Sequence, residues 1–225
     1  MQKNNNNSVQ NDHNILKMYG CEYFKADTTS VFESSKNQPY YFKTYIGENE
    51  INVELGDTIY YISDNKKEAY AKKGPMVINS KYCATVIRGF MASPVTASLE
   101  ESTVLPYVNG CSTRQIIYPQ RLGDPTLQFL KIPAFSKEQA HHIHSTARVV
   151  YILRGSGISL VGMEGKSVTT KLEEGMVCIL DPMCPHHFET PDESIEVVPL
   201  HVFSSVGSME SSHPMFNGTH LMNHG

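Results

Sequence analysis

The chain has 225 residues, of which 40% are hydrophobic, and it carries a formal net charge of -4 with a pI near 6.2. This composition is typical of a globular protein, and the lack of a basic excess argues against a nucleic-acid partner. The longest apolar run, Val149 to Leu153, is far shorter than the roughly 20 residues of a membrane-spanning helix. Five scattered cysteines without a CxxC pair do not suggest a disulfide framework. We therefore expect a cytoplasmic protein without a membrane partner.

The two ends of the chain show no pattern of packed structure. Residues 1–14 are polar and rich in asparagine, without the apolar core or cleavage site of a signal peptide. Residues 205–225 mix Ser, Met, Gly and His without periodicity. We expect a disordered N-terminus at 1–14 and a loosely packed tail, or an arm that docks on a neighbour, at 205–225.

Between the ends, short stretches rich in β-branched and aromatic residues alternate with turn residues. In chain order these include YYFKTYI, INVEL, TIYYIS, MVINS and YCATVIRGF, and after Pro106 TRQIIYP, TLQFLKI, RVVYILR, ISLVG, SVTTKL, MVCIL, HHFET and IEVVPLHVF. Many short strands at close spacing predict an all-β sandwich or barrel. The best helix candidate is a short turn at Phe135 to Ala140. A loop-like stretch near 95–110 separates an N-terminal β unit at 15–105 from a second β barrel at 106–204.

Three histidines fall within four positions in the stretch AHHIHST. Alternate residues of a strand share a face, so His142 and His144 point to one side and His141 to the other. Arg148 has the parity of His142 and His144. Downstream, a proline-bearing turn precedes His186, which opens the next strand. If two strands bring His142, His144 and His186 together, their imidazoles form a site for a divalent transition metal.

These positions resemble the two motifs of the cupin superfamily, G-x5-H-x-H-x(3,4)-E-x6-G and G-x5-P-x-G-x2-H-x3-N. The positions that follow this spacing are His142, His144, Arg148, Gly155, Gly175 and His186. The resemblance covers about residues 105–205 and implies a jelly-roll β-barrel with its metal inside. It implies that His142, His144 and His186 are the metal ligands.

The sequence also departs from the two motifs. Ser136 and Met183 stand where the family has glycine, Asp181 where it has proline, and Thr190 where it has asparagine. The main departure is Arg148, which replaces the glutamate ligand, so no carboxylate ligand carries over. The resemblance then implies a three-histidine centre, as in thiol dioxygenases and some diketone or gentisate dioxygenases of the superfamily.

Arg148 admits two interpretations. In the first, its planar guanidinium binds a carboxylate or phosphate of the substrate through two parallel hydrogen bonds. In the second, it ends the strand and pairs with an acidic neighbour, and the metal site is weak or empty. A buried cation beside a metal dication is unfavourable unless an anion lies between them. An occupied centre therefore predicts a bound anion.

Four other side chains are weighed against the same pattern. His201 lies on the stretch IEVVPLHVF and is either a catalytic acid or base or a satisfied core residue. Phe188 shares parity with His186 and is expected to form an apolar wall of the substrate pocket. His141 and His187 have the opposite parity, which favours surface or supporting roles.

Residues 15–105 contain no histidine, so a second cupin there would have lost its metal.

Two functions remain open. The first is a metal-dependent cupin enzyme, a three-histidine non-haem iron dioxygenase-like oxidoreductase or a related lyase or isomerase, acting on a small anionic organic molecule. Its cofactor is one divalent transition metal, with iron first and nickel, zinc, manganese or copper as alternatives. The second is a non-catalytic cupin that binds or senses a small ligand, which the eroded motif positions suggest. Sheet edges that need covering favour a homodimer.

Overall fold

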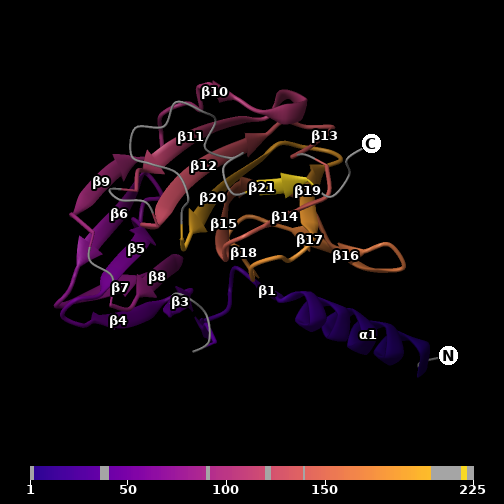
Figure 1. Ribbon diagram of the computed structural model, residues 1–225, viewed down its shortest axis with the longest axis horizontal. Coiled ribbons are helices and arrows are strands. Elements are labelled where there is room, and N and C mark those ends of the chain that lie inside the picture. Colours follow the sequence, from indigo (N-terminus) through magenta and orange to yellow (C-terminus); the bar gives the residue numbers. More distant parts are fainter. Residues whose placement is uncertain are drawn as a thin grey trace.

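A computed structural model describes residues 3–35, 41–89, 92–119, 123–138, 140–203 and 219–221. Antiparallel strands make up most of this part of the chain. Figure 1 shows the N-terminal strands gathered at one end of the molecule and the C-terminal strands at the other. The predicted all-β architecture is confirmed, and several predicted strands, TLQFLKI and HHFET among them, match to the residue.

The C-terminal half forms two sheets, which we call the jelly roll. The first sheet holds, in spatial order, β1 (Cys21–Phe24), β18 (Val177–Leu180), β15 (Arg148–Gly155), β20 (Ile195–His201), β12 (Thr126–Ile132), β11 (Ser112–Ile117) and β10 (Leu105–Pro106). The second holds β17 (Lys166–Leu172), β16 (Gly157–Met163), β19 (His186–Thr190), β14 (His142–His144) and β21 (Thr219–Leu221), with β13 (Ser136–Lys137) beside β19. A short 3-10 turn, η1 (Val108–Gly110), precedes β11.

The N-terminal half forms a second pair of sheets, which we call the N-terminal β unit. Its larger sheet has the order β2 (Ser30–Glu33), β3 (Phe42–Ile46), β8 (Cys83–Ile87), β5 (Thr58–Ile62), β6 (Glu68–Lys73) and β9 (Val95–Ser98). Its smaller sheet pairs β4 (Asn49–Val53) with β7 (Met76–Ser80). The division at about residue 105 remains a proposal, because β1 precedes this unit in the chain and pairs with β18 of the jelly roll.

The central strands of the first sheet of the jelly roll are buried on both faces. Val150 and Ile152 of β15 face the jelly-roll interior, whereas Val149 and Tyr151 pack in a cluster shared with the N-terminal β unit. A strand covered on both sides carries apolar residues at every position rather than at alternate ones. This explains the continuous apolar run of RVVYILR.

Three segments differ from the sequence-based expectation. Residues 3–19 form the helix α1 (Lys3–Tyr19), where we expected disorder up to residue 14. Leu16 and Tyr19 near its end pack on the jelly-roll core, and such docking stabilises a helix whose polar sequence gives little signal. The turn expected at Phe135 to Ala140 contains the strand β13 instead. Within the expected tail, β21 pairs with β14, while residues 204–218 and 222–225 lie outside the described part.

The helix α1 extends from the jelly-roll end of the molecule, as Figure 1 shows. Among the helices of the described residues, none is long and apolar enough to cross a lipid bilayer.

Candidate metal centre

The strand pairing places three histidines side by side. His142 of β14 lies opposite His186 of β19 in the antiparallel register. The Nε2 atoms of His142 and His144 are 3.1 Å apart, and the ring centroid of His186 lies 4.6 Å from that of His142 and 5.1 Å from that of His144. One ligand atom from each ring fits within 4.8 Å of the others, the only such group of metal-ligating side chains found in the described residues. All three side chains are buried.

Backbone carbonyls fix the orientation of two of these rings. Nδ1 of His142 donates to the carbonyl oxygen of Ala140 at 2.9 Å, and Nδ1 of His186 donates to that of Cys184 at 2.8 Å. Because a carbonyl only accepts, the proton sits on Nδ1 and the lone pair of each neutral ring is on Nε2. The lone pair of His142 therefore faces Nε2 of His144, which either donates a hydrogen bond to it or, with the proton on its own Nδ1, offers a second lone pair to a metal ion. The donor set fits a metal ion.

Burial keeps the three rings uncharged. It lowers the pKa of His142 to about 2 and that of His186 to about 4, and it holds the pKa of His144 well below its ordinary value. The neighbouring histidines and Arg148 add repulsion against a further proton. A metal ion therefore displaces no proton from these rings at neutral pH.

The turn between β18 and β19 joins the two ligand-bearing segments. The N–H of Met183 donates to the carbonyl of His144 at 2.7 Å, and the N–H of Cys184 donates to that of Asp181 at 3.2 Å. Met183 has a φ of 67°, in the left-handed region that favours glycine. This is the position where the cupin motif has glycine, so the turn keeps its backbone shape without its usual residue.

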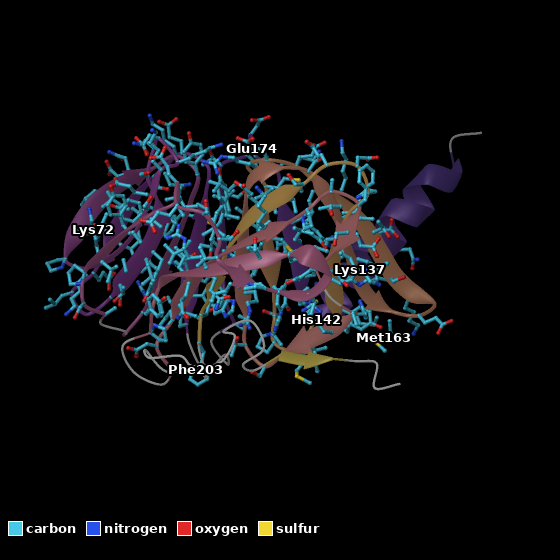
Figure 2. The ribbon with its side chains drawn as sticks, turned by 90° about the horizontal axis from the view of Figure 1, so that it is seen from above. Lys72, Lys137, His142, Met163, Glu174 and Phe203 are labelled. Carbon is cyan, nitrogen blue, oxygen red and sulfur yellow. The ribbon has the colours of Figure 1, made fainter. Side chains whose placement is uncertain are left out.

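A small cavity lies beside the histidines. It is lined by Leu130, Glu138, His144, Arg148, Val150, Leu180, His186, Phe188, Val197, Pro199 and His201. Its free volume of about 20 Å³ has room for roughly one water molecule. Figure 2 shows His142 at the jelly-roll end of the molecule, in the region of Lys137 and Met163, with Lys72 at the opposite end.

Arg148 enters this cavity from β15, as its parity predicted. It is 4% exposed, and its guanidinium donates to the hydroxyl of Thr146. No described carboxylate lies within 4.0 Å of its nitrogens, so the acidic neighbour of our second interpretation is not in direct contact. Burial lowers the pKa of Arg148 to about 9, which leaves the side chain charged at neutral pH. The position of this charge favours an anion in the cavity.

Glu138 lines the same cavity, and the sequence analysis did not identify it. It is 4% exposed, and its Oε2 has no hydrogen-bond partner. Burial raises its pKa to about 7, against the opposing influence of Arg148 and of the Phe188 amide. A signal was available in the sequence, because Glu138 is the only acidic residue between Pro125 and Met163.

The structure also positions the two further candidates in the cavity wall. The ring of His201 lies 6.5 Å from that of His144, and its strand pairs residue 201 with Arg148. Burial, reinforced by Arg148, holds the pKa of His201 well below its ordinary value. The ring of Phe188 lies 6.0 Å from that of His186. Their proposed roles, catalytic for His201 and substrate-lining for Phe188, remain proposals.

His141 and His187 form contacts of their own, away from the three-histidine group. Their Nδ1 atoms are 2.9 Å apart, Nε2 of His141 donates to the carbonyl of Gly162, and Nε2 of His187 lies 2.9 Å from Glu189. These bonds join the residue that directly precedes β14 to β16 and β19. These contacts help to fix the positions of the neighbouring residues His142 and His186.

No protein-family model and no curated protein sequence matches this chain. Solved structures do match. Salicylate 1,2-dioxygenase from Pseudoaminobacter salicylatoxidans, solved as adducts with gentisate, aligns with a TM-score of 0.53 at 7% identity over 81% of each chain. A cupin 2 conserved barrel domain protein from Leptotrichia buccalis aligns with a TM-score of 0.44 at 15% identity over 80% of this chain and 91% of its own. A Bacillus subtilis oxalate decarboxylase mutant gives a TM-score of 0.49 at 9% identity over 89% and 79%.

The protein thus shares the fold of the salicylate dioxygenase, and its jelly roll brings three histidines together inside it. The alignment with the salicylate dioxygenase covers a larger share of the chain than residues 106–204 alone. The fold likeness therefore includes strands of the N-terminal β unit. At such low identity the likeness concerns the fold and not the substrate.

Proposed function

We propose that the protein is a metal-dependent, dioxygenase-like enzyme that acts on a small anionic organic molecule. Its metal, iron in the first place, would be held by His142, His144 and His186. The observation that carries the proposal is the convergence of three buried, neutral imidazoles with two Nε2 atoms freed by Nδ1–carbonyl bonds. Such a metal, when bound, supplies open coordination positions and Lewis acidity, and iron also supports chemistry with dioxygen.

The other cavity residues take roles that follow from their positions. Arg148 binds the anionic group of the substrate, since its charge is buried without an ion-pair partner in the described residues. Phe188 forms an apolar wall. His201 is neutral and buried beside His144, so it is suited to accept a proton from the substrate. The dioxygenase of the same fold is named after salicylate, which is also a small organic anion.

A second candidate is a cupin that binds or senses a small ligand without turnover. The eroded motif positions at Asp181, Met183 and Thr190 favour it, and so does the small free volume of the cavity. Both candidates share the ligand site, and fold alone does not separate them.

We also propose a homodimer and a cytoplasmic location. The five cysteines are buried free thiols, which fits a reducing compartment. The strand edges of open sheets favour a covering partner, and light scattering of the purified protein measures the mass directly.

Metal content tests the proposed centre. We expect the wild-type protein to hold about one equivalent of a transition metal, and His144→Ala to lose nearly all of it, because two imidazoles alone bind too weakly. His13→Ala, on the exposed face of α1, is the matched control and keeps the metal. Elemental mass spectrometry of untagged protein makes the measurement. Equal metal in His144→Ala and wild type contradicts the centre.

Oxygen consumption then separates the two candidates. With an iron-loaded protein, we expect dioxygen uptake with at least one small thiol, diketone or aromatic acid. Stoichiometric ligand binding without consumption of ligand or dioxygen would favour the binding protein instead.

A further inference from the structure

The cavity contains two charged groups that do not touch each other. Arg148 and Glu138 both line it, and both are 4% exposed. Each influences the pKa of the other, yet no ion pair within 4.0 Å joins them in the described structure. A buried carboxylate and guanidinium normally close into direct contact, because desolvation is otherwise uncompensated. Their separation leaves a place for a group that bonds to both.

Oε2 of Glu138 lies at one end of the space between the two charged groups. Oε2 of Glu138 is buried and accepts no hydrogen bond, although an unsatisfied buried acceptor costs on the order of 1–3 kcal/mol or more. A ligand group with an O–H or N–H next to its anionic group satisfies Oε2 and Arg148 together. The free volume of about 20 Å³ favours the smallest ligands of this kind, and the side chains that line the cavity must move apart to admit one.

Charge selects a hydroxyl over an ammonium group as the donor. Arg148 and a metal dication already place positive charge in the cavity, so a ligand ammonium adds a further unfavourable cation. A hydroxyl adds no charge. It donates to an ionised Glu138 and accepts from a protonated one, which matters because the pKa of this carboxyl is about 7.

On the basis of the proposed function, we propose that the protein binds a small aliphatic 2-hydroxycarboxylate, with its carboxylate on Arg148 and its hydroxyl on Oε2 of Glu138. Glu138 is then the residue that determines specificity for the hydroxyl. Arg148 binds the carboxylate of any small acid, with or without that hydroxyl.

Glycolate and acetate are the probes, since they differ by this hydroxyl alone. Titration calorimetry on zinc-loaded protein measures both affinities without turnover. We expect Glu138→Leu to weaken glycolate binding about tenfold and to change acetate binding less than about twofold. Glu138→Gln keeps an acceptor but loses its charge, so it should weaken glycolate binding about threefold. The exposed Glu164→Leu is the matched control and leaves both affinities unchanged.

The comparison of the two acids isolates Glu138 from the metal. Glycolate chelates metal ions by itself, so its preference in the wild type alone is not diagnostic, whereas the change in that preference is. Equal weakening of both acids, or no change in either, overturns the role of Glu138. If Glu138→Leu does not fold, as judged by circular dichroism, Glu138→Gln decides: an unchanged ratio of the two affinities overturns the proposal.

The same titrations distinguish this inference from the proposed function. Arg148→Gln should weaken both acids, because it removes the anion site itself. Binding of both acids that depends on Arg148 but not on Glu138 refutes the hydroxyl specificity and leaves the anion site in place. No binding of either acid to the wild type refutes both, while the metal content still tests the three-histidine centre.

Discussion

The N-terminal β unit and the jelly roll use the same kind of antiparallel sheet but fill their interiors differently. Between its two sheets the N-terminal β unit packs an apolar cluster of Ile51, Val53, Ile59, Ala84 and Val86. No histidine occurs in residues 15–105. The jelly roll combines a larger apolar cluster with buried histidines, an arginine and a glutamate. The N-terminal β unit also buries polar side chains, such as Thr44, Thr85 and Asp57, but these bond to one another or to the backbone. The buried histidines, arginine and glutamate of the jelly roll instead line a cavity, which points to function.

The N-terminal β unit and the jelly roll nevertheless pack against each other. The apolar cluster that contains Val149 and Tyr151 of β15 also contains Phe42 and Ile87 of the N-terminal β unit. Arg148 directly precedes Val149 on the same strand. The N-terminal β unit therefore supports the back of the sheet that carries Arg148 and His201. We therefore propose that the N-terminal β unit has a structural role in holding the cavity.

The largest expected difference between the regions is their response to acid. Burial lowers the pKa of the four histidines of the three-histidine group and the cavity wall, His142, His144, His186 and His201. As the pH falls below about 6.5, these histidines take up protons in the unfolded chain but not in the folded one, so stability falls. Glu138 acts oppositely, since its pKa of about 7 in the folded state makes protonation there favourable. The loss of stability from the four histidines exceeds the gain from Glu138.

For the chelator-treated protein, we expect the free energy of unfolding to drop on the order of 4 kcal/mol between about pH 7.5 and about pH 5.5. Urea unfolding at the two pH values measures this. Hydrogen exchange should show lost protection in β14 and β19 before β3 and β8. Equal stability at both pH values, or earlier loss in the N-terminal β unit, would contradict the assignment of buried neutral histidines.

A pair of glycines offers the next comparison. Gly155 in the jelly roll and Gly56 in the N-terminal β unit both have positive φ, 77° and 94°. A Cβ on Gly155 would lie 2.0 Å from the carbonyl oxygen of Ser194, whereas a Cβ on Gly56 meets nothing within 4 Å. We expect Gly155→Ala to cost about 3 kcal/mol and Gly56→Ala about 1 kcal/mol, measured by urea unfolding. Similar losses in both variants would show that backbone conformation, not the close approach, decides.

The sequence revealed the features that depend on local pattern. Strand periodicity and turn residues predicted most strands, and the parity of His142, His144 and Arg148 predicted their common face. It did not reveal Glu138, because the place of that residue depends on β13 pairing with β19, a contact across 54 residues from Ser136 to Thr190 in the chain. The helix α1 was missed for a related reason, since its polar sequence is stabilised by docking and not by periodicity.

The smallest expected effect concerns two residues that stand in left-handed backbone without being glycine. Met183 in the jelly roll has a φ of 67° and is 58% exposed, and Lys66 in the N-terminal β unit has a φ of 58°. Glycine removes the backbone strain of about 1–2 kcal/mol but adds freedom to the unfolded chain that offsets part of it. We expect Met183→Gly to raise the free energy of unfolding by about 0.5 kcal/mol.

Lys66→Gly should bring no such gain, because Lys66 bonds to Glu174 at 2.7 Å and lies over the ring of Tyr82. Met183 holds its turn through its backbone N–H, which glycine retains, so Met183→Gly should keep the wild-type metal content. A loss above about 1 kcal/mol in Met183→Gly would mean that its side chain packs in a way exposure does not show. A loss of metal at unchanged stability would instead mean that the methionine side chain, rather than the shape of the turn, positions His186.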